Sequence, residues 1–327
     1  MFPQTRMRRL RRKNIIPLLQ ETNLQKSDLI APLFFEAGIN EPVRIESMPG
    51  QYRWPVRMAS EIAEKYGKLG IRAVLIFGIP LKKDKEASEA YSEDGVVQQV
   101  IRGIKAVCPD LVVVADLCAC EYTDHGHCGV IGECCDGPGL LNDPSLIMMK
   151  KIAISQARAG ADIVAPSCML DGMVSSIRQA LDENGYCEVL IMSYSSKFAS
   201  SLYGPFRDAA GSGYSFGDRT GYQAPVTNSR EAYRESLLDA EEGADILMVK
   251  PAGWFGDIIS DIRQIGLPVA AYQVSGEYAM IKAATERGWL DERRVIFESL
   301  LSIKRSGADL IITYFAEDIC RWLDEEQ

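Results

Sequence analysis

The sequence predicts a single closed (β/α)8 barrel, an α/β fold in which eight parallel strands alternate with helices. A Gly-Ala-Asp triplet recurs where a helix-like segment gives way to an apolar run, and its copies begin at Gly160, Gly243 and Gly307. Glycine suits the left-handed position that closes a helix, and a continuous apolar run suits a strand covered on both faces. Eight such runs are spread over 327 residues, a length that this kind of barrel commonly fills as one domain.

The apolar runs predict the strands in order, and the amphipathic stretches between them predict the helices. We expect strands at residues 29–35, 73–78, 111–117, 163–165, 189–193, 246–249, 269–274 and 310–313. We expect helices at residues 59–69, 94–107, 146–159, 174–183, 230–242 and 292–305. An open doubly wound sheet is the alternative, but no glycine-rich dinucleotide fingerprint follows any of these strands.

Two segments differ from this alternation. Residues 1–25 include the basic run 6–13 and predict an N-terminal arm, for which a nucleic-acid arm and a transit peptide are alternatives to our preferred contact with a neighbouring subunit. Residues from about 197 to 228 are rich in Ser, Gly, Tyr and Phe, and they predict an active-site lid because they follow a strand end. Residues 26–327 are otherwise expected to form one catalytic domain.

Composition narrows the function and the compartment. The net charge of −9 argues against nucleic acid as a partner, and no apolar run is long enough to predict a membrane span. The nine cysteines are odd in number, and no secretory signal is visible. This pattern favours free thiols in a reducing, cytoplasmic compartment over a disulfide framework.

The most unusual stretch is the loop 116–128, which begins where the third predicted strand ends. It contains Cys118, Cys120 and Cys128 together with both histidines of the chain, His125 and His127. Three thiolates with an open fourth position are typical of a catalytic zinc site, whereas a structural site uses four protein ligands. His127 is either a fourth ligand or, as we prefer, a residue that supports the ligands.

Two lysines also follow predicted strands, at the end of a barrel where chemistry is usually located. Lys250 directly follows the sixth strand, and Lys197 lies shortly after the fifth. Burial and a neighbouring ammonium group both lower the pKa of a lysine, so each could lower the pKa of the other. A neutral amine attacks carbonyl carbons and forms a Schiff base. The alternative for either residue alone is a lysine that extends its charge into solvent at the barrel rim.

Groups that bind anions are found in the lid and at later strand ends. Arg207 and Arg219 belong to the lid, and guanidinium groups there are suited to bind a carboxylate or phosphate. Ser275 and Tyr314 follow the seventh and eighth strands and offer hydroxyl donors for a second anionic group.

Several motifs together resemble the porphobilinogen synthase family, also called 5-aminolevulinate dehydratases, over nearly the whole chain. The motifs lie at residues 8–11, 115–128, 203–210, 248–251 and 272–278. The resemblance implies condensation of two 5-aminolevulinate molecules to porphobilinogen, with loss of two waters, in heme and tetrapyrrole biosynthesis. It also implies a homo-octamer whose N-terminal arms wrap neighbouring subunits.

The resemblance assigns roles to residues of this chain. Lys250 would hold the molecule that becomes the propionate side, Lys197 would hold the molecule that becomes the acetate side, and Asp116 would be an acid near the reacting amine. Cys118, Cys120 and Cys128 match the zinc ligands of the cysteine-rich branch. The resemblance also implies that Arg207 and Arg219 bind the acetate-side carboxylate. It implies that Ser275 and Tyr314 bind the propionate-side carboxylate. Additional substrate-binding residues implied by the resemblance are Tyr203, Phe206 and Gln223.

Glu235 matches a residue that holds an activating, allosteric Mg²⁺ between subunits in some members. The chain also departs from the family pattern at Cys168, Met173, Cys134 and Cys135. We expect Cys168 to alter the polar environment of the lysines, and the fold and reaction to survive these changes. A class I aldolase with one catalytic lysine and no metal, and a zinc-stabilised RNA-binding protein, are the alternative functions.

Overall fold

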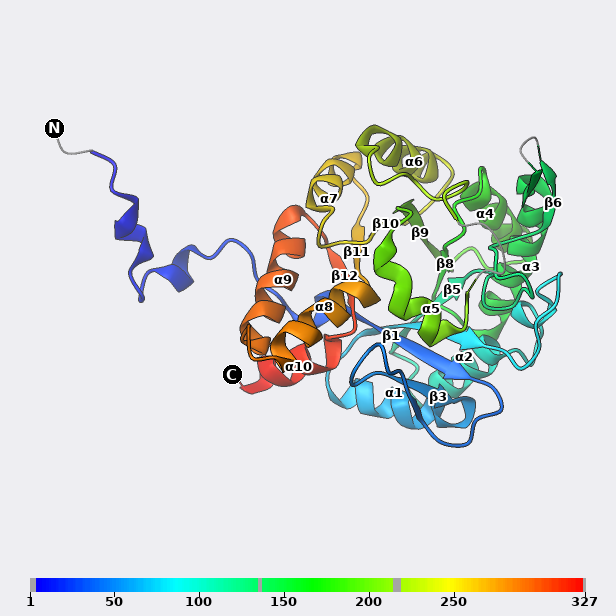
Figure 1. The fold of residues 1–327 in the computed structure, drawn as a ribbon, viewed down its shortest axis with the longest axis horizontal. Coiled ribbons are helices and arrows are strands. Elements are labelled where there is room, and N and C mark those ends of the chain that lie inside the picture. The colour runs from blue at the N-terminus through cyan, green and yellow to red at the C-terminus, as the bar shows by residue number, and fades with distance from the viewer. Residues whose placement is uncertain (1–3, 135–136, 214–218, 326–327) are drawn as a thin grey trace.

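Eight parallel strands close into a barrel in the computed structural model, which describes residues 4–134, 137–213 and 219–325 (Figure 1). Pairing of the first strand with the last closes the ring through Leu29 with Ile311 and Ile30 with Ile312. The predicted barrel is therefore confirmed, and the open-sheet alternative is wrong. The barrel strands are β1 (Leu29–Glu36), β4 (Ala73–Ile79), β5 (Val112–Leu117), β8 (Ile163–Pro166), β9 (Leu190–Lys197), β10 (Ile246–Lys250), β11 (Val269–Gln273) and β12 (Leu310–Thr313).

The aspartate of each Gly-Ala-Asp triplet explains why the triplet precedes a strand. Asp162 accepts a hydrogen bond from Val113 N at 2.7 Å, Asp245 accepts one from Ile191 N at 2.8 Å, and Asp309 accepts one from Val269 N at 2.9 Å. Each carboxylate therefore binds the backbone of a neighbouring strand at the start of its own strand. The three triplet glycines have φ values of 105°, 102° and 122°, which side-chain-bearing residues rarely adopt.

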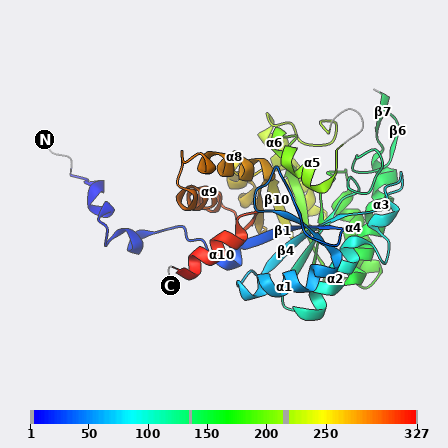
Figure 2. The same ribbon diagram turned by 60° about the horizontal axis from the view of Figure 1, so that its bottom comes forward.

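Helices cover the outside of the barrel (Figures 1 and 2). Six of them overlap the predicted helices, namely α1 (Ala59–Lys68), α2 (Val96–Val107), α3 (Asn142–Ala159), α4 (Met173–Glu183), α6 (Ser229–Glu241) and α9 (Glu292–Ser306). Four helices were not predicted, namely α5 (Gly204–Ala210), α7 (Gly256–Ile262), α8 (Ser275–Glu286) and α10 (Ala316–Glu325). The short helix α5 lies within the Gly- and Ser-rich segment. It was missed because the composition of that segment is typical of a loop.

Shorter elements complete the described chain. The additional strands are β2 (Val43–Arg44) and β3 (Tyr52–Pro55), which extend the sheet from β1, and the hairpin β6 (Ile131–Cys134) with β7 (Gly137–Leu140). The 3-10 helices are η1 (Met7–Arg11), η2 (Ile16–Leu19), η3 (Lys26–Asp28), η4 (Val56–Met58), η5 (Ser88–Ala90), η6 (Ser201–Tyr203) and η7 (Arg263–Ile265). None of the described helices is long and apolar enough to cross a membrane.

The N-terminal residues and the lid segment lie differently against the barrel. Both η1 and η2 contain no buried residue, and this part of the chain extends away from the barrel in both views (Figures 1 and 2). The lid segment instead packs down, since Phe206 of α5 contacts the rings of Phe34 and Phe77 from β1 and β4. The lid prediction includes residues 214–218, which lie outside the described chain.

Candidate active site at the barrel mouth

Lys197 and Lys250 are direct neighbours at the carboxyl ends of two adjacent barrel strands. They are register partners in the β9–β10 pairing, and their exposed fractions are only 6% and 4%. The strand β9 was predicted to end at Ser193, but it continues to Lys197 because its polar side chains find partners inside the fold. Ser196, for example, donates to Ala232 O at 2.9 Å. The extension places the two lysines side by side.

Aromatic rings surround the amine of Lys250. Its Nζ lies 4.1 Å from the ring centroid of Tyr272, 4.9 Å from that of Tyr194, 5.0 Å from that of Phe206 and 5.5 Å from that of Tyr203. Burial and the neighbouring Lys197 ammonium lower the pKa of Lys250 to about 7. Ring faces favour the ammonium form and so partly oppose this shift. Lys250 thus has a substantial neutral fraction near neutral pH, as the sequence led us to expect.

Lys197 behaves differently from its neighbour. Burial lowers the pKa of Lys197, but the nearby thiols of Cys128, Cys118 and Cys120, where ionised, raise it by more, so the net shift is upward. Its Nζ donates to the backbone oxygen of Ser167 at 2.6 Å. The expected mutual lowering of the two pKa values is therefore found only at Lys250, because Lys197 lies close to the cysteine group, which raises its pKa.

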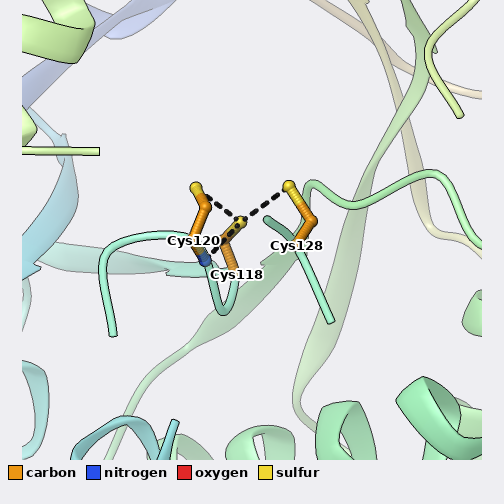
Figure 3. Close-up of side chains that lie close together, drawn as sticks. All are labelled: Cys118, Cys120 and Cys128. Carbon is orange, nitrogen blue, oxygen red and sulfur yellow. Dashed lines mark hydrogen bonds between the residues drawn. The ribbon is translucent and has the colours of Figure 1, made fainter. Parts of the chain in front are cut away.

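The three cysteines of the 116–128 loop come together as one group (Figure 3). Cys118 Sγ lies 3.1 Å from Cys120 Sγ and 3.6 Å from Cys128 Sγ, and all three side chains are buried. Their sulfur atoms lie within 4.8 Å of one another. A tetrahedral ion with metal–sulfur bonds of about 2.3 Å separates its sulfur ligands by about 3.8 Å, so small shifts suffice to bind one. The donor set fits a thiophilic divalent cation.

His127 lies beside this group and contributes no donor atom to it. Its Nδ1 is 3.2 Å from the hydroxyl of Tyr222, a residue of the lid segment. The supporting role preferred from the sequence agrees with this position better than the role of a fourth ligand.

Asp116 lies near Cys118 and interacts electrostatically with both lysines. Burial, Cys118 and Glu121 raise its pKa well above the ordinary value, while Lys197 and Lys250 act in the opposite direction. The Ser167 hydroxyl lies 3.4 Å from Asp116 Oδ2. The carboxyl of Asp116 therefore retains a proton more readily than an ordinary aspartate.

Two residues of this region were overlooked as site residues. Glu121 groups with Asp116 and Cys118 within 4.8 Å, and burial and Cys118 raise its pKa to about 7 against the effect of Arg219. Tyr194 contributes a ring to the Lys250 surroundings. Its hydroxyl has no partner that meets hydrogen-bond geometry among the described residues. The sequence signal that could have identified Tyr194 is its position three residues before Lys197, on a strand that is longer than predicted.

The lid side chains expected to bind a carboxylate lie at different depths. Arg219 is buried and donates to Gly126 O at 3.0 Å and to Ser212 O at 2.9 Å, which joins the lid to the cysteine loop. Arg207 is half-buried on α5. Gln223 is buried, and its Nε2 has no hydrogen-bond partner in the described ranges. An orphaned buried donor of this kind is suited to bind a polar ligand.

The remaining predicted substrate residues form hydrogen bonds that connect the strand ends with the segment around α5. Ser275 Oγ accepts from Phe206 N at 2.9 Å and lies 3.3 Å from Leu202 O, which connects the start of α8 with α5. The hydroxyl of Tyr314 lies 3.0 Å from that of Tyr272. Tyr203 reaches Phe198 O at 2.7 Å and Lys250 O at 3.1 Å. Tyr203 borders the Lys250 amine directly, and Tyr314 reaches that region through Tyr272, whose ring faces the amine.

Glu235 lies on α6, away from the barrel mouth. Burial and the neighbouring Asp239, Asp171, Glu231 and Glu242 raise its pKa. The structure thus places it in a cluster of acidic residues on the outer layer. Met173 is buried at the start of α4, Cys134 ends β6, and Cys135 lies outside the described residues.

Comparisons with known proteins found relatives that match nearly the whole chain. A family model described as delta-aminolevulinic acid dehydratase matches residues 4–322. The curated delta-aminolevulinic acid dehydratase of Archaeoglobus fulgidus is 52% identical over 323 residues, covering 98% of this chain and 99% of that protein. The one from Synechococcus elongatus is 52% identical over 326 residues, covering 99% of this chain and 100% of that protein.

A solved structure also matches over nearly the whole length. It is the delta-aminolevulinic acid dehydratase (porphobilinogen synthase) of Toxoplasma gondii, in complex with the reaction product porphobilinogen. The TM-score is 0.96 at 42% sequence identity, and the match covers 99% of this chain and 93% of that one.

Proposed function

The chain belongs to the delta-aminolevulinic acid dehydratase family, and from that premise we propose how its barrel mouth carries out the reaction. As a porphobilinogen synthase, a hydro-lyase, it condenses two molecules of 5-aminolevulinate to porphobilinogen and releases two waters. The observation that carries the proposal is the adjacent, buried pair Lys197 and Lys250. Two ketone substrates call for two activated amines, and an aldolase with one catalytic lysine does not account for the pair.

Lys250 binds the molecule that becomes the propionate side. Its neutral amine attacks the ketone carbon, a proton is transferred to the former carbonyl oxygen, and loss of water forms the Schiff base. The pKa of about 7 keeps a large fraction of the amine reactive near neutral pH. The surrounding rings, including Tyr272 at 4.1 Å, keep bulk water away from the new bond.

Lys197 binds the molecule that becomes the acetate side. Its amine faces the cysteine group, and the negative charge of ionised thiols there, that of Cys128 and Cys118 foremost, raises its pKa. A cation held by the three cysteines would neutralise that charge, which would lower the pKa of Lys197 and favour its neutral amine. Asp116, whose carboxyl retains a proton readily, is positioned to protonate the departing oxygen.

Cys118, Cys120 and Cys128 would hold the Zn²⁺ ion, with a fourth position open to substrate. A bound ion would supply Lewis acidity next to the acetate-side molecule. Arg219 and Tyr222 connect the lid to this region, so lid closure and the metal centre are structurally linked.

Two sets of side chains orient the substrate carboxylates. Arg207 and Arg219, assisted by Gln223, bind the acetate-side carboxylate from the lid. Ser275 and Tyr314 bind the propionate-side carboxylate, and Tyr203 and Phe206 line the space beside Lys250. Holding each carboxylate fixes its ketone opposite one lysine, which gives the asymmetric pairing of two identical substrates.

The proposal extends to the assembly of subunits and to their regulation. Residues 1–25 act as an arm that contacts a neighbouring subunit in a homo-octamer, since η1 and η2 bury nothing against their own barrel. Exposed apolar side chains on the arm, among them Leu10, Ile16 and Leu18, supply the contact surface. Glu235 and its acidic neighbours hold an activating Mg²⁺ between subunits, and the protein works in the cytoplasm.

The direct test measures porphobilinogen formation from 5-aminolevulinate by metal-stripped protein after addition of zinc, magnesium or both. We expect no turnover without zinc, recovery with zinc, and a further increase with magnesium that Glu235→Gln abolishes. Full turnover in the stripped protein would overturn the metal assignment. Turnover with magnesium alone would show that the assignment of zinc to the cysteine site is wrong.

A further inference from the structure

A fourth cysteine lies against the three-thiol group from a different strand. Cys168 follows β8 and is only 1% exposed. Its Sγ lies 3.6 Å from Cys118 Sγ and 3.8 Å from Met149 Sδ. It also interacts with the Cys128 thiol. Cys168 was expected to affect the lysines, but its own side chain contacts the sulfur atoms of the proposed metal centre.

The geometry favours a hydrogen-bond donor over a ligand. Cys118, Cys120 and Cys128 form a group of donor atoms within mutual reach, and Cys168 does not belong to any such group among the described residues. Among the acceptors within reach of the Cys168 thiol, Cys118 Sγ at 3.6 Å is nearer than Met149 Sδ at 3.8 Å and Leu117 O at 4.0 Å. A ligand sulfur that accepts such a bond is held in orientation and donates less charge to its ion.

The residue before Cys168 connects the same segment to the chemistry. Ser167 accepts from Lys197 Nζ at 2.6 Å through its backbone oxygen, and its hydroxyl lies 3.4 Å from Asp116. Its backbone N–H donates to Leu117 O at 3.1 Å. Residues 167 and 168 therefore contact a proposed metal ligand, a Schiff-base lysine and the acidic aspartate within one short turn.

We propose that Cys168 is a positioning residue of the metal centre, which donates its S–H to the Cys118 sulfur and fixes that ligand relative to Lys197. The proposal rests on the zinc site of the proposed function. Cys168 itself remains a thiol and does not bind the ion. Residues that support metal ligands in this way typically change metal affinity about 10- to 100-fold when removed.

The test compares Cys168→Ala, which removes the donor, with Cys168→Ser, which keeps a hydroxyl donor. Cys320→Ala is the matched control, because Cys320 is also fully buried but lies on α10. Zinc dissociation constants are measured by competition with a chromophoric chelator, and thermal melting of the metal-free proteins confirms that each variant is folded. We expect about 10- to 100-fold weaker binding in Cys168→Ala. The serine variant and the control should remain within about threefold of the unmodified protein.

Equal zinc affinity in Cys168→Ala and the unmodified protein would overturn the inference, as would equal losses in the alanine and serine variants. X-ray absorption of the zinc-loaded unmodified protein needs no variant. Three sulfur neighbours and one lighter atom are expected, and four sulfur neighbours would show that Cys168 is a ligand. If the unmodified protein does not bind zinc, the proposed metal centre itself is refuted. This outcome differs from a change in affinity that is seen only in the Cys168 variants.

Discussion

Substitution of Lys197 by glutamine should raise the pKa of Lys250, because it removes the neighbouring positive charge. Burial is the larger cause of the lowered value, so the pKa should stay below that of an exposed lysine. A nearby charge typically shifts a pKa by about 1 to 3 units. A rise of about one unit from about 7 would reduce the neutral fraction of Lys250 at pH 7 from about one half to about one tenth.

The variant cannot complete the condensation, so the assay follows the first covalent step. Metal-free protein, in which Lys197 keeps its positive charge, is mixed with 5-aminolevulinate, and the imine on Lys250 is trapped with borohydride at several pH values. We expect Lys197→Gln to trap about fivefold more slowly at pH 7 and to converge with the unmodified protein above about pH 9. The matched control is Lys68→Gln, which removes a charge from an exposed side chain. Identical pH profiles for Lys197→Gln and the unmodified protein would refute the like-charge argument and leave burial as the sole cause.

Three further predictions concern separate parts of the structure. Asp245→Ala should lower the free energy of unfolding by about 1–3 kcal/mol in urea titrations, because the Ile191 N–H loses its acceptor; an unchanged midpoint would contradict this. Gln223→Leu should raise the KM for 5-aminolevulinate more than it lowers kcat, since it removes a buried donor proposed to bind substrate. Chelation should abolish turnover while the far-ultraviolet circular dichroism stays unchanged; unfolding on chelation would indicate a structural metal.

The barrel could be predicted from the sequence because its signals are local. A glycine that ends a helix, an aspartate and an apolar run are contiguous in sequence, and the structure shows why the aspartate is needed. The end of β9 was missed because Ser193, Ser195 and Ser196 resemble a loop by composition. Their burial depends on partners elsewhere in the chain, such as Ala232 O, which no local pattern indicates.

The residue types of the candidate site could be predicted from the sequence, but the directions of the lysine pKa shifts could be predicted only in part. The cysteine spacing and the strand-end lysines indicated residues that the structure brings together, the cysteines in one group and the lysines as register partners. The opposite pKa shifts of Lys197 and Lys250 were not foreseen, because they depend on which amine faces the thiolates. The contact between Cys168 and Cys118 also escaped the sequence, since 50 residues separate the two sulfur atoms that lie 3.6 Å apart.

The central claim is that two adjacent lysines hold the two substrates, and one measurement addresses it directly. Zinc-loaded protein is incubated with 5-aminolevulinate, reduced with borohydride and digested, and the modified lysines are identified by mass spectrometry. We expect substrate-derived mass on both Lys197 and Lys250 and on no other lysine. Modification of Lys250 alone, under conditions that support porphobilinogen formation, would contradict the two-lysine account.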